Sequence, residues 1–319
     1  MLSLERVSKT YRVGTFGGKQ LHAVSDVSFS INDGEVVSLI GESGSGKSTI
    51  GKMILRLISI TDGRIDFNGT NVASLKGHAL RDYYREVQGV FQDPFSSYNP
   101  IFKADRVFEV IRRHFYSRMK GREWQAKVHG SLEAVGLNPR HVLSKYPHQL
   151  SGGQLQRFLI ARALLLDIRF LVADEIISML DASTRIDVLN LLADLKERGL
   201  GVLFITHDLS LAYYISEDAA ILYRGAVVEF GKTESIYDNP IHPYTRMLMA
   251  SVPRLDQKWE DVEIELRAKE EALSVGCVYY ERCPAVRRSP ACRDRRPDLI
   301  EIEPRHFVAC SSIDKEACP

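Results

Sequence analysis

Two glycine-rich loops, about a hundred residues apart, have the composition of phosphate-binding segments. The first is Gly41-Glu42-Ser43-Gly44-Ser45-Gly46-Lys47-Ser48-Thr49, and the second is Leu150-Ser151-Gly152-Gly153-Gln154. In the first loop the glycines let backbone N–H groups close round a phosphate, and Lys47 adds positive charge. One such loop predicts a nucleotide site, against the alternative of a chance glycine turn. The pair predicts ATP held between two protein surfaces.

Two adjacent carboxylates follow a short apolar run, Phe170-Leu171-Val172-Ala173. We interpret Asp174 as the acid that orients the water shell of Mg²⁺, an ion that prefers hard oxygen ligands and would also suit the Ser48 hydroxyl. A helix cap is the alternative role for Asp174. Glu175 lies beside it, where a carboxylate can polarise the water that attacks the γ-phosphate. The sequence therefore predicts Glu175 as the general base.

Three further residues are candidates for the same site. His207 follows Val202-Leu203-Phe204-Ile205 and can bond the γ-phosphate, although a histidine at a strand end is often structural. Gln92 can touch Mg²⁺ or the attacking water and relay its presence, the alternative being an ordinary surface amide. Tyr11 can stack on adenine, the alternative being a tyrosine packed in the core.

The elements that must position these residues alternate between strands and helices. Val36-Val37-Ser38-Leu39-Ile40 leads into the first loop, and a helix is expected from Ser48 through Leu57. The buried runs at 170–173 and 202–205 flank a helix expected from Thr184 to Arg198, which Gly199 ends. This α/β pattern predicts a mainly parallel sheet covered by helices, with catalytic groups at the carboxyl ends of the strands.

Other segments depart from that pattern. Strands are expected at 23–31 and at 64–67, the second ending in the Asn68-Gly69 turn, and a hairpin is expected round Tyr223-Arg224-Gly225. From Asp93 to about Arg162 the pattern is helical. A final helix starts at 242–246, and the charge-rich segment 255–275 is expected to be a surface helix or linker.

Composition limits the partners. The 319 residues carry a net charge of +1, so no basic field favours nucleic acid, and the 45% hydrophobic content can fill a sizeable core. No apolar run approaches the roughly 20 residues needed to cross a bilayer. The N-terminus lacks the basic and apolar regions of a secretory signal. We therefore expect a cytoplasmic protein.

In this order the motifs resemble those of the ATP-binding subunits of ABC transporters, across residues 1 to 250. Two nucleotide-binding domains pack head to tail in that family, so the resemblance implies that Ser151, Gly152, Gly153 and Gln154 cap ATP held by the partner's 41–49 loop. A helix opening at Gln154 would present N–H groups to phosphate. Ser178-Met179-Leu180-Asp181 resembles the D-loop of the dimer interface. Ile176-Ile177 departs from the Pro-Thr common in relatives, which puts the efficiency of hydrolysis in doubt.

The subclass is indicated by Phe91-Gln92-Asp93-Pro94-Phe95-Ser96-Ser97-Tyr98-Asn99-Pro100 and His242-Pro243-Tyr244-Thr245-Arg246. These segments resemble the oligopeptide, dipeptide and nickel importer group, closest to its F-type ATPase subunit. The resemblance implies a second, D-type ATPase subunit, two permease subunits in the membrane and an external solute-binding protein. The chain would then lie at the cytoplasmic face of the membrane, with oligopeptide, dipeptide, oligosaccharide or nickel as cargo.

The expected fold is thus a P-loop ABC-type nucleotide-binding domain over 1–254, with an N-terminal antiparallel β subdomain and a helical subdomain at about 93–165. Residues 255–319 form a small Cys-rich extension. A soluble ABC ATPase acting on nucleic acid or ribosomes is the alternative, but such chains usually carry a long coiled-coil insert or two nucleotide domains. A phosphotransferase would have no use for the second loop.

All five cysteines follow Gly276. A reducing cytosol disfavours disulfides, so clustered cysteines are expected to bind a metal or cluster. Cys277, Cys283, Cys292 and Cys310 resemble the extension of the importer group, which implies a 4Fe-4S cluster. Zinc and unligated thiols remain alternatives, although the wide spacing differs from zinc ribbons. Cys318 is a spare. A solvated basic face is expected of Arg282, Arg287, Arg288, Arg293, Arg295 and Arg296, which could also offset cluster charge.

Overall fold

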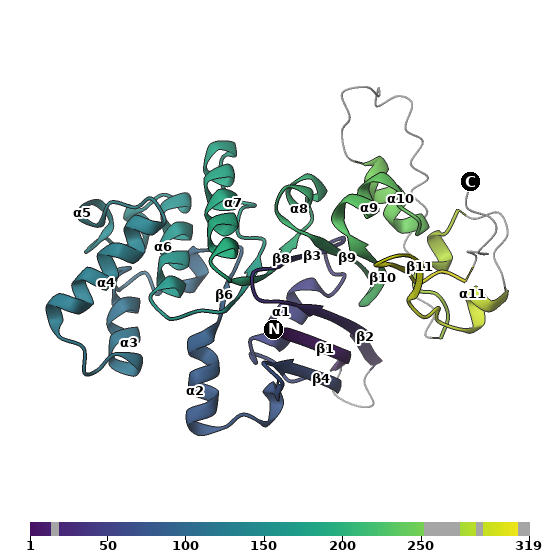
Figure 1. The fold of residues 1–319 in the computed structure, drawn as a ribbon, viewed down its shortest axis with the longest axis horizontal. Coiled ribbons are helices and arrows are strands. Elements are labelled where there is room, and N and C mark those ends of the chain that lie inside the picture. Colours follow the sequence, from purple (N-terminus) through teal and green to yellow (C-terminus); the bar gives the residue numbers. More distant parts are fainter. Residues whose placement is uncertain (14–18, 252–274, 285–289, 312–319) are drawn as a thin grey trace. The chain divides into compact units, whose positions relative to one another are not determined.

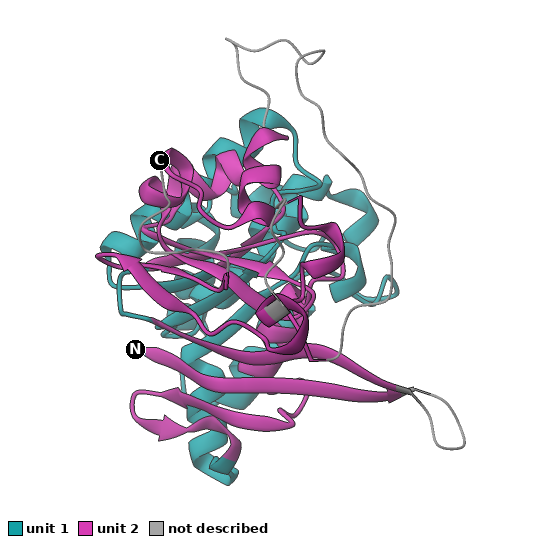
Figure 2. Ribbon diagram, turned by 90° about the vertical axis from the view of Figure 1, so that its right-hand side faces the viewer, with its two compact units in different colours: residues 1, 31–35, 74–203 teal, residues 2–30, 36–73, 204–319 magenta. Residues whose placement is uncertain are grey.

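The computed structural model describes residues 1–13, 19–251, 275–284 and 290–311 (Figure 1). The chain divides into two compact units (Figure 2). Unit 1 consists of residues 1, 31–35 and 74–203, and unit 2 consists of 2–30, 36–73 and 204–319. Among the helices of the described ranges, none combines the length and apolar character needed to cross a bilayer. Of the surface helix or linker expected at 255–275, residues 255–274 lie outside the described residues, as does Cys318.

One sheet of unit 2 is built from the N-terminal strands. Its order is β2-β1-β4-β5, and β1 pairs antiparallel with β4. The strands are β1 (Leu2–Val13), β2 (Lys19–Ile31), β4 (Asp62–Phe67) and β5 (Thr70–Asn71). Asn68 and Gly69 both have positive φ, 50° and 77°, as a tight hairpin turn requires. The predicted antiparallel start of the chain is confirmed.

A second sheet of unit 2 carries the first glycine loop. Within this unit its order is β11-β12-β10-β9-β3, with β3 parallel to β9 and β9 antiparallel to β10. The strands are β3 (Val36–Ile40), β9 (Asp218–Tyr223), β10 (Ala226–Lys232), β11 (Ile300–Glu303) and β12 (His306–Val308). Every residue of β3 and β9 is buried. The predicted hairpin turns at Arg224 and Gly225, whose φ angles are 44° and 83°.

The helices of unit 2 follow its strands. They are α1 (Lys47–Ile54), η1 (Val72–Ser74), α8 (Leu209–Ile215), α9 (Thr233–Asp238), α10 (Pro243–Ala250), η5 (Tyr280–Arg282) and α11 (Pro290–Asp294). The prediction that the first helix runs through Leu57 is wrong. Arg56 has a φ of 52°, a left-handed backbone that cannot continue a helix, so α1 ends at Ile54.

Unit 1 holds two parallel strands and most of the helices. The strands β6 (Val87–Val90) and β7 (Phe170–Asp174) pair in parallel. The helices are α2 (Gly77–Glu86), η2 (Phe95–Ser97), α3 (Arg106–Phe115), α4 (Gly121–Ala134), α5 (Pro139–Val142), η3 (Pro147–Gln149), α6 (Gly152–Leu164) and α7 (Ala182–Glu197). In Figure 1, α3 to α6 occupy the region predicted to be helical. Helix α2 was not predicted.

Aromatic rings hold the helices of unit 1 together. Phe108 of α3 stacks on Phe158 of α6, with ring centroids 4.6 Å apart, and Tyr98 meets Phe158 edge-on at 6.4 Å. Helix α4 also packs against α6. Gly199 has a φ of 95° and follows α7, as the sequence predicted for its end. The boundary between the units falls within β8 (Gly201–Thr206).

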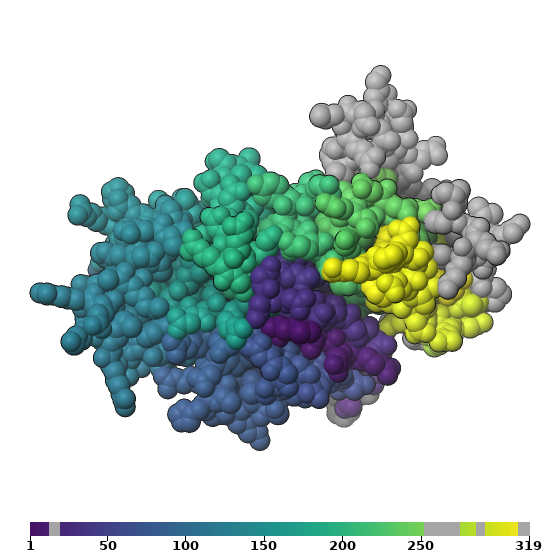
Figure 3. All heavy atoms as spheres, in the orientation of Figure 1, coloured from purple at the N-terminus to yellow at the C-terminus, as the bar shows by residue number. Residues whose placement is uncertain are grey.

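The described part of the Cys-rich extension shares its core with the rest of unit 2. Strand β12 pairs antiparallel with β10, from Glu229 opposite Val308 to Gly231 opposite His306. Val278 and Tyr279 are buried in the same apolar cluster as Tyr223 and Tyr244. Figure 3 shows the extension in yellow, lying directly against the green part of the chain. The extension therefore completes the hydrophobic core of this unit.

Candidate nucleotide-binding site

The first glycine loop joins β3 to α1 and makes close backbone approaches on both sides. A Cβ on Gly41 would come 2.1 Å from Leu222 O, and one on Gly46 would come 2.5 Å from Ala23 O. Gly46 also has a φ of 106°, which is open to glycine and rarely to other residues. The hairpin turn supports the loop, since Gly225 N–H donates to Ser45 O at 2.8 Å. The loop thus has little room to change shape.

Polar groups inside the loop suit an anion. The Lys47 side chain is 5% exposed, and its ammonium donates to Gly41 O at 2.6 Å and to Glu42 O at 2.9 Å. The Ser45 hydroxyl is buried and has no hydrogen-bond partner among the described residues. A buried hydroxyl without a partner costs roughly 1–3 kcal/mol, which a bound oxygen atom would recover. Ser48 and Thr49 follow in the first turn of α1.

The two predicted acids lie at the carboxyl end of β7 in unit 1. Asp174 is 6% exposed and is the last residue of the strand. Glu175 has a φ of 51°, a strained conformation for a residue other than glycine. Ser178 holds this turn, donating to Glu175 O from its hydroxyl at 2.9 Å and from its N–H at 3.2 Å. Strain of this kind collects at functional sites, and the sequence carried no signal of it.

The two isoleucines that depart from the family pattern lie in the core of unit 1. Ile176 is 1% exposed and Ile177 is 2% exposed. Their side chains therefore support the turn after Glu175 by packing, where a proline would have supported it by a fixed φ.

The second glycine loop starts α6 and closes on itself. Gln154 N–H donates to the Ser151 hydroxyl at 3.2 Å, and Ser151 N–H donates to the Gln154 side chain at 3.0 Å. This is a capping box, so the helix begins at Gly152 and the prediction that it opens at Gln154 is wrong. Gly153 packs on α7, since a Cβ there would lie 3.2 Å from Thr184 Cγ2. Ser151 is exposed.

Asp181 caps α7. Its carboxylate accepts from the Ser183 hydroxyl at 2.6 Å, from Thr184 N–H at 3.0 Å and from the Thr184 hydroxyl at 2.9 Å. The Ser183 bond, followed by the two Thr184 bonds, lowers the pKa of Asp181. Asp181 therefore has a structural role within the subunit as the N-cap of α7. Its role in nucleotide binding, implied by the resemblance to the D-loop, stays a prediction.

The three remaining candidates all lie on exposed surface. Gln92 follows β6, and the loop is tied to α6 where the Gln156 amide donates to Phe91 O at 3.3 Å. His207 follows β8, next to Asp208, which caps α8. Tyr11 of β1 is 36% exposed, with the Lys9 ammonium 5.0 Å from its ring centroid, so it is not a core tyrosine. The 41–49 loop, His207 and Tyr11 belong to unit 2, and the other candidate nucleotide-site residues to unit 1.

Four of the cysteines lie in the described part of the extension. Burial, and to a smaller extent the charges of Cys310, Cys292 and Cys283, raise the pKa of the Cys277 thiol to about 11. Cys277 N–H also donates to Cys292 O at 2.7 Å. Across the described ranges, no three His, Cys, Asp or Glu side chains are grouped so that they could hold a metal ion.

The expectation of a solvated basic face is wrong for Arg282. Its side chain is 11% exposed and pairs with Glu42 of the first glycine loop at 3.0 Å. Arg295, by contrast, has a side chain 79% exposed and pairs locally with Asp298. Arg287 and Arg288 lie outside the described residues. No spacing in the sequence links position 282 to position 42, so this contact could not be found by sequence reasoning.

Two segments of the chain match known protein families, and close relatives cover most of its length. Residues 24–178 match the family described as ABC transporter, and residues 228–292 match the family described as oligopeptide/dipeptide transporter, C-terminal region. The oligopeptide transport ATP-binding protein OppF of Bacillus subtilis is 41% identical over 299 residues, which is 92% of this chain and 92% of that protein. OppF of Streptococcus mutans is 44% identical over 258 residues, covering 80% of this chain and 82% of its own length.

A solved structure shows the same architecture. The ATP-binding cassette MJ0796, in a dimeric post-hydrolysis state bound to ADP and Pi, is 32% identical with a TM-score of 0.66. The match covers 73% of this chain and 99% of the cassette. The chain therefore belongs to the ABC transporter family, as an ATPase of the group that contains the oligopeptide transport ATP-binding proteins.

Proposed function

We propose that the chain binds ATP in the 41–49 loop and hydrolyses it to drive import of oligopeptides or dipeptides. The observation that carries the site is the pair formed by the buried Ser45 hydroxyl without a partner and the enclosed Lys47 ammonium. The cargo class is supported by the names of the relatives, which are oligopeptide transport ATP-binding proteins. Oligosaccharide and nickel remain alternative cargoes.

Each candidate residue then has a role. The N–H groups of residues 41–49 and the Lys47 ammonium bind the phosphates, and Tyr11 stacks on adenine. Ser48, Gln92 and Asp174 would hold Mg²⁺, and the ion would offset phosphate charge. Glu175 accepts the proton of the attacking water, and His207 bonds the γ-phosphate.

A second ATPase subunit of the D type completes the site in this proposal. Ser151 and the two glycines after it would face the ATP held by the partner's loop, at the positive end of the α6 dipole. Exposure of Ser151 supports this role, because a residue that serves another subunit must be reachable. The cassette MJ0796 is itself a dimer in its post-hydrolysis state.

Two permease subunits are the proposed membrane partners, placing the chain at the cytoplasmic face with a solute-binding protein outside. An apolar group follows Gln92 closely in unit 1: Phe95, Ile101 and Phe102 are 46%, 75% and 39% exposed. Exposed apolar side chains near one another are typical of protein interfaces. This surface is the proposed contact through which the Gln92 segment moves the permease.

The extension at 255–319 is proposed to hold a 4Fe-4S cluster on Cys277, Cys283, Cys292 and Cys310, beside an ABC domain over 1–254 with a helical subdomain at about 93–165. Thiolates are the usual ligands of such clusters. The hydrogen bond from Cys277 N–H to Cys292 O supports the proposal, because it brings two of the four cysteines next to each other. The cluster would supply redox chemistry or a rigid cross-link.

Co-expression tests the transport proposal. The chain, the proposed D-type ATPase subunit and the two permeases should purify as one complex. In vesicles, that complex should import peptides only with ATP and Mg²⁺. Recovery with nucleic acid or ribosomes, and without permeases, would favour the soluble alternative. For the extension, anaerobic protein should show a charge-transfer absorbance band and contain iron. Zinc alone, or no metal, would exclude the cluster.

A further inference from the structure

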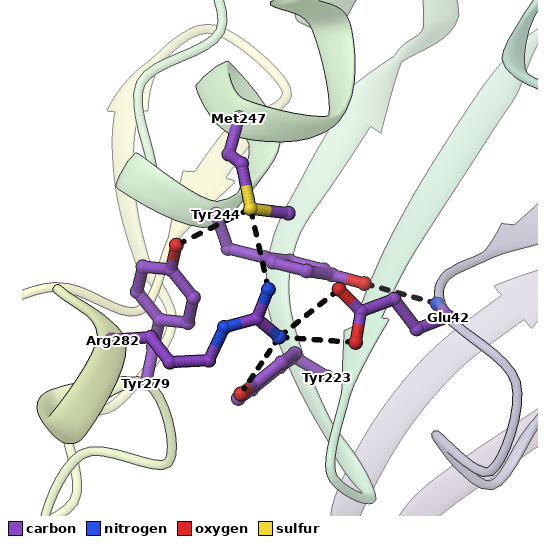
Figure 4. Close-up of polar contacts among 6 residues, drawn as sticks. All are labelled: Glu42, Tyr223, Tyr244, Met247, Tyr279 and Arg282. Carbon is purple, nitrogen blue, oxygen red and sulfur yellow. Dashed lines mark hydrogen bonds and ion pairs between the residues drawn. The ribbon is translucent and has the colours of Figure 1, made fainter. Parts of the chain in front are cut away.

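Glu42, the second residue of the first glycine loop, is bound by a residue from the far end of the chain. Arg282 donates through one nitrogen, Nη1, to Glu42 Oε1 at 3.0 Å and to Oε2 at 3.1 Å (Figure 4). The same nitrogen lies 3.4 Å from the Tyr223 hydroxyl. This pair joins the Cys-rich extension to the proposed ATP site.

Arg282 is held by its surroundings. Its guanidinium lies 5.7 Å from the Tyr223 ring centroid and 5.9 Å from that of Tyr279, and Nη2 approaches Met247 Sδ at 3.5 Å. Figure 4 shows these side chains gathered round the guanidinium, which points toward Glu42. An arginine packed against rings loses little further entropy on pairing, so this ion pair is worth more than a mobile surface pair.

The backbone of Glu42 is fixed by a second residue. Its N–H donates to the hydroxyl of Tyr244, a fully buried side chain at the start of α10. That start is itself anchored by the buried Glu229, which accepts from Ile241 N–H and His242 N–H, each at 2.9 Å, and contacts His306 Nε2 at 2.7 Å. Tyr244 and Arg282 together therefore restrain Glu42 through both its main chain and its side chain. We refer to Glu42, Tyr244 and Arg282 as the Glu42 clamp.

Glu42 in turn shapes the anion site. Its carbonyl accepts from the Lys47 ammonium at 2.9 Å and from Ser45 N–H at 3.2 Å. A shift of Glu42 would therefore move the two groups proposed to bind phosphate. Sites for charged ligands bind best when their donors are already in place before the ligand arrives.

We infer that Arg282 is a positioning residue for ATP: from the extension, through Glu42, it holds the 41–49 loop in its binding conformation. The inference rests on the proposed role of that loop. It assigns the extension a task in nucleotide affinity that is independent of what the cysteines bind.

Calorimetric titration of the full chain with ATP and Mg²⁺ tests the inference. Arg282→Met should raise the Kd for ATP roughly tenfold, the size of one coupled charged pair, and Glu42→Gln should raise it by a similar factor. The double variant should be no worse than either single one, because both changes break the same contact. Arg282→Lys should recover part of the affinity, since lysine restores the charge without the planar group.

Further measurements distinguish a role of Arg282 in positioning the loop from a role in folding. Arg295→Met removes an exposed arginine of the same extension and should leave the Kd unchanged. In the assembled transporter, Arg282→Met should raise KM for ATP while kcat changes less than about twofold. A purely structural role would lower the melting temperature and the active fraction, with an unchanged Kd for the folded molecules, and would overturn the inference. If Arg282→Met does not fold, Glu42→Gln and Arg282→Lys give the same test.

Lys47→Ala distinguishes a failure of the inference about Arg282 from a failure of the proposed ATP site. Loss of ATP binding in Lys47→Ala, with a parental Kd in both Arg282→Met and Glu42→Gln, would disprove the clamp and leave the nucleotide site intact. Parental ATP binding by Lys47→Ala would instead disprove the proposed site itself.

Discussion

The two glycine loops are supported in opposite ways. The loop at 41–49 is held by residues distant in the sequence, among them Gly225, Tyr244 and Arg282. The loop at 150–154 is held by its own capping box and by packing on the next helix of unit 1. Long-range support suits a cradle whose shape must be fixed in advance. Local support suits a segment that the proposed partner subunit must be able to reach.

The largest expected effect is on the turn that carries Glu175. Glu175→Gln keeps the side-chain shape but removes the proposed base, so ATP hydrolysis should fall roughly 10²–10⁴-fold while ATP binding is kept. Phosphate release by the assembled complex measures the rate, and gel filtration with ATP should show a trapped dimer. Hydrolysis at the parental rate would mean that another residue is the base.

Ser151→Arg tests whether the second loop serves a partner. The side chain is exposed, so the subunit should fold and bind ATP with parental affinity on its own. A bulky cation at the proposed interface should nevertheless lower hydrolysis by the assembled complex at least about tenfold. A weakened Kd in the isolated subunit would contradict the division between the loops.

Glu229→Ala tests the long-range support of the first loop. The buried carboxylate accepts from Ile241 N–H and His242 N–H and contacts His306, so its loss leaves buried donors without an acceptor. The free energy of unfolding should fall by about 3 kcal/mol. Urea denaturation measures this change, with the exposed Glu234→Ala as the matched control. Equal stability of the two variants would show that Glu229 does not support α10.

The smallest expected effect is a pH dependence from His242. Burial lowers the pKa of this histidine from 6.5 to about 4 in the folded chain. Between these values the unfolded chain binds a proton that the folded chain does not, so stability falls as pH falls through the window. At pH 5.5 the loss should be about 1 kcal/mol.

His242→Asn provides the comparison for that prediction. Asparagine keeps an acceptor for Tyr244 N–H, the bond that His242 Nδ1 now makes at the start of α10. Urea denaturation at pH 7 and pH 5.5 should show a smaller decrease for the variant than for the parent. An equal decrease would assign the pH dependence to other groups.

Sequence reasoning found the elements whose signals are local. Apolar runs, Asn68-Gly69 and Gly199 marked β3, a hairpin turn and the end of α7, because each depends on neighbours in the chain. The predicted C-terminus of α1 and the predicted N-terminus of α6 were wrong. The left-handed residue Arg56 ends α1, and the Ser151 capping box sets the start of α6. The type and order of the candidate residues could also be predicted, because the motifs that contain them are local.

Contacts between residues far apart in the sequence could not be predicted. Nothing near Arg282 or Glu229 predicts their partners, since these pairs join segments 240 and 77 residues apart. Tertiary contacts of this kind depend on the folded chain and have no periodic pattern.

The left-handed backbone of Glu175 carries a further consequence for how this enzyme can evolve. Glycine would adopt that φ of 51° without strain, so Glu175→Gly should relieve the turn even as it removes the proposed general base. If Glu175 is the base, this position keeps its activity at a cost in folding stability. An inactive chain that melts at a higher temperature than its parent would be the mark of that trade-off.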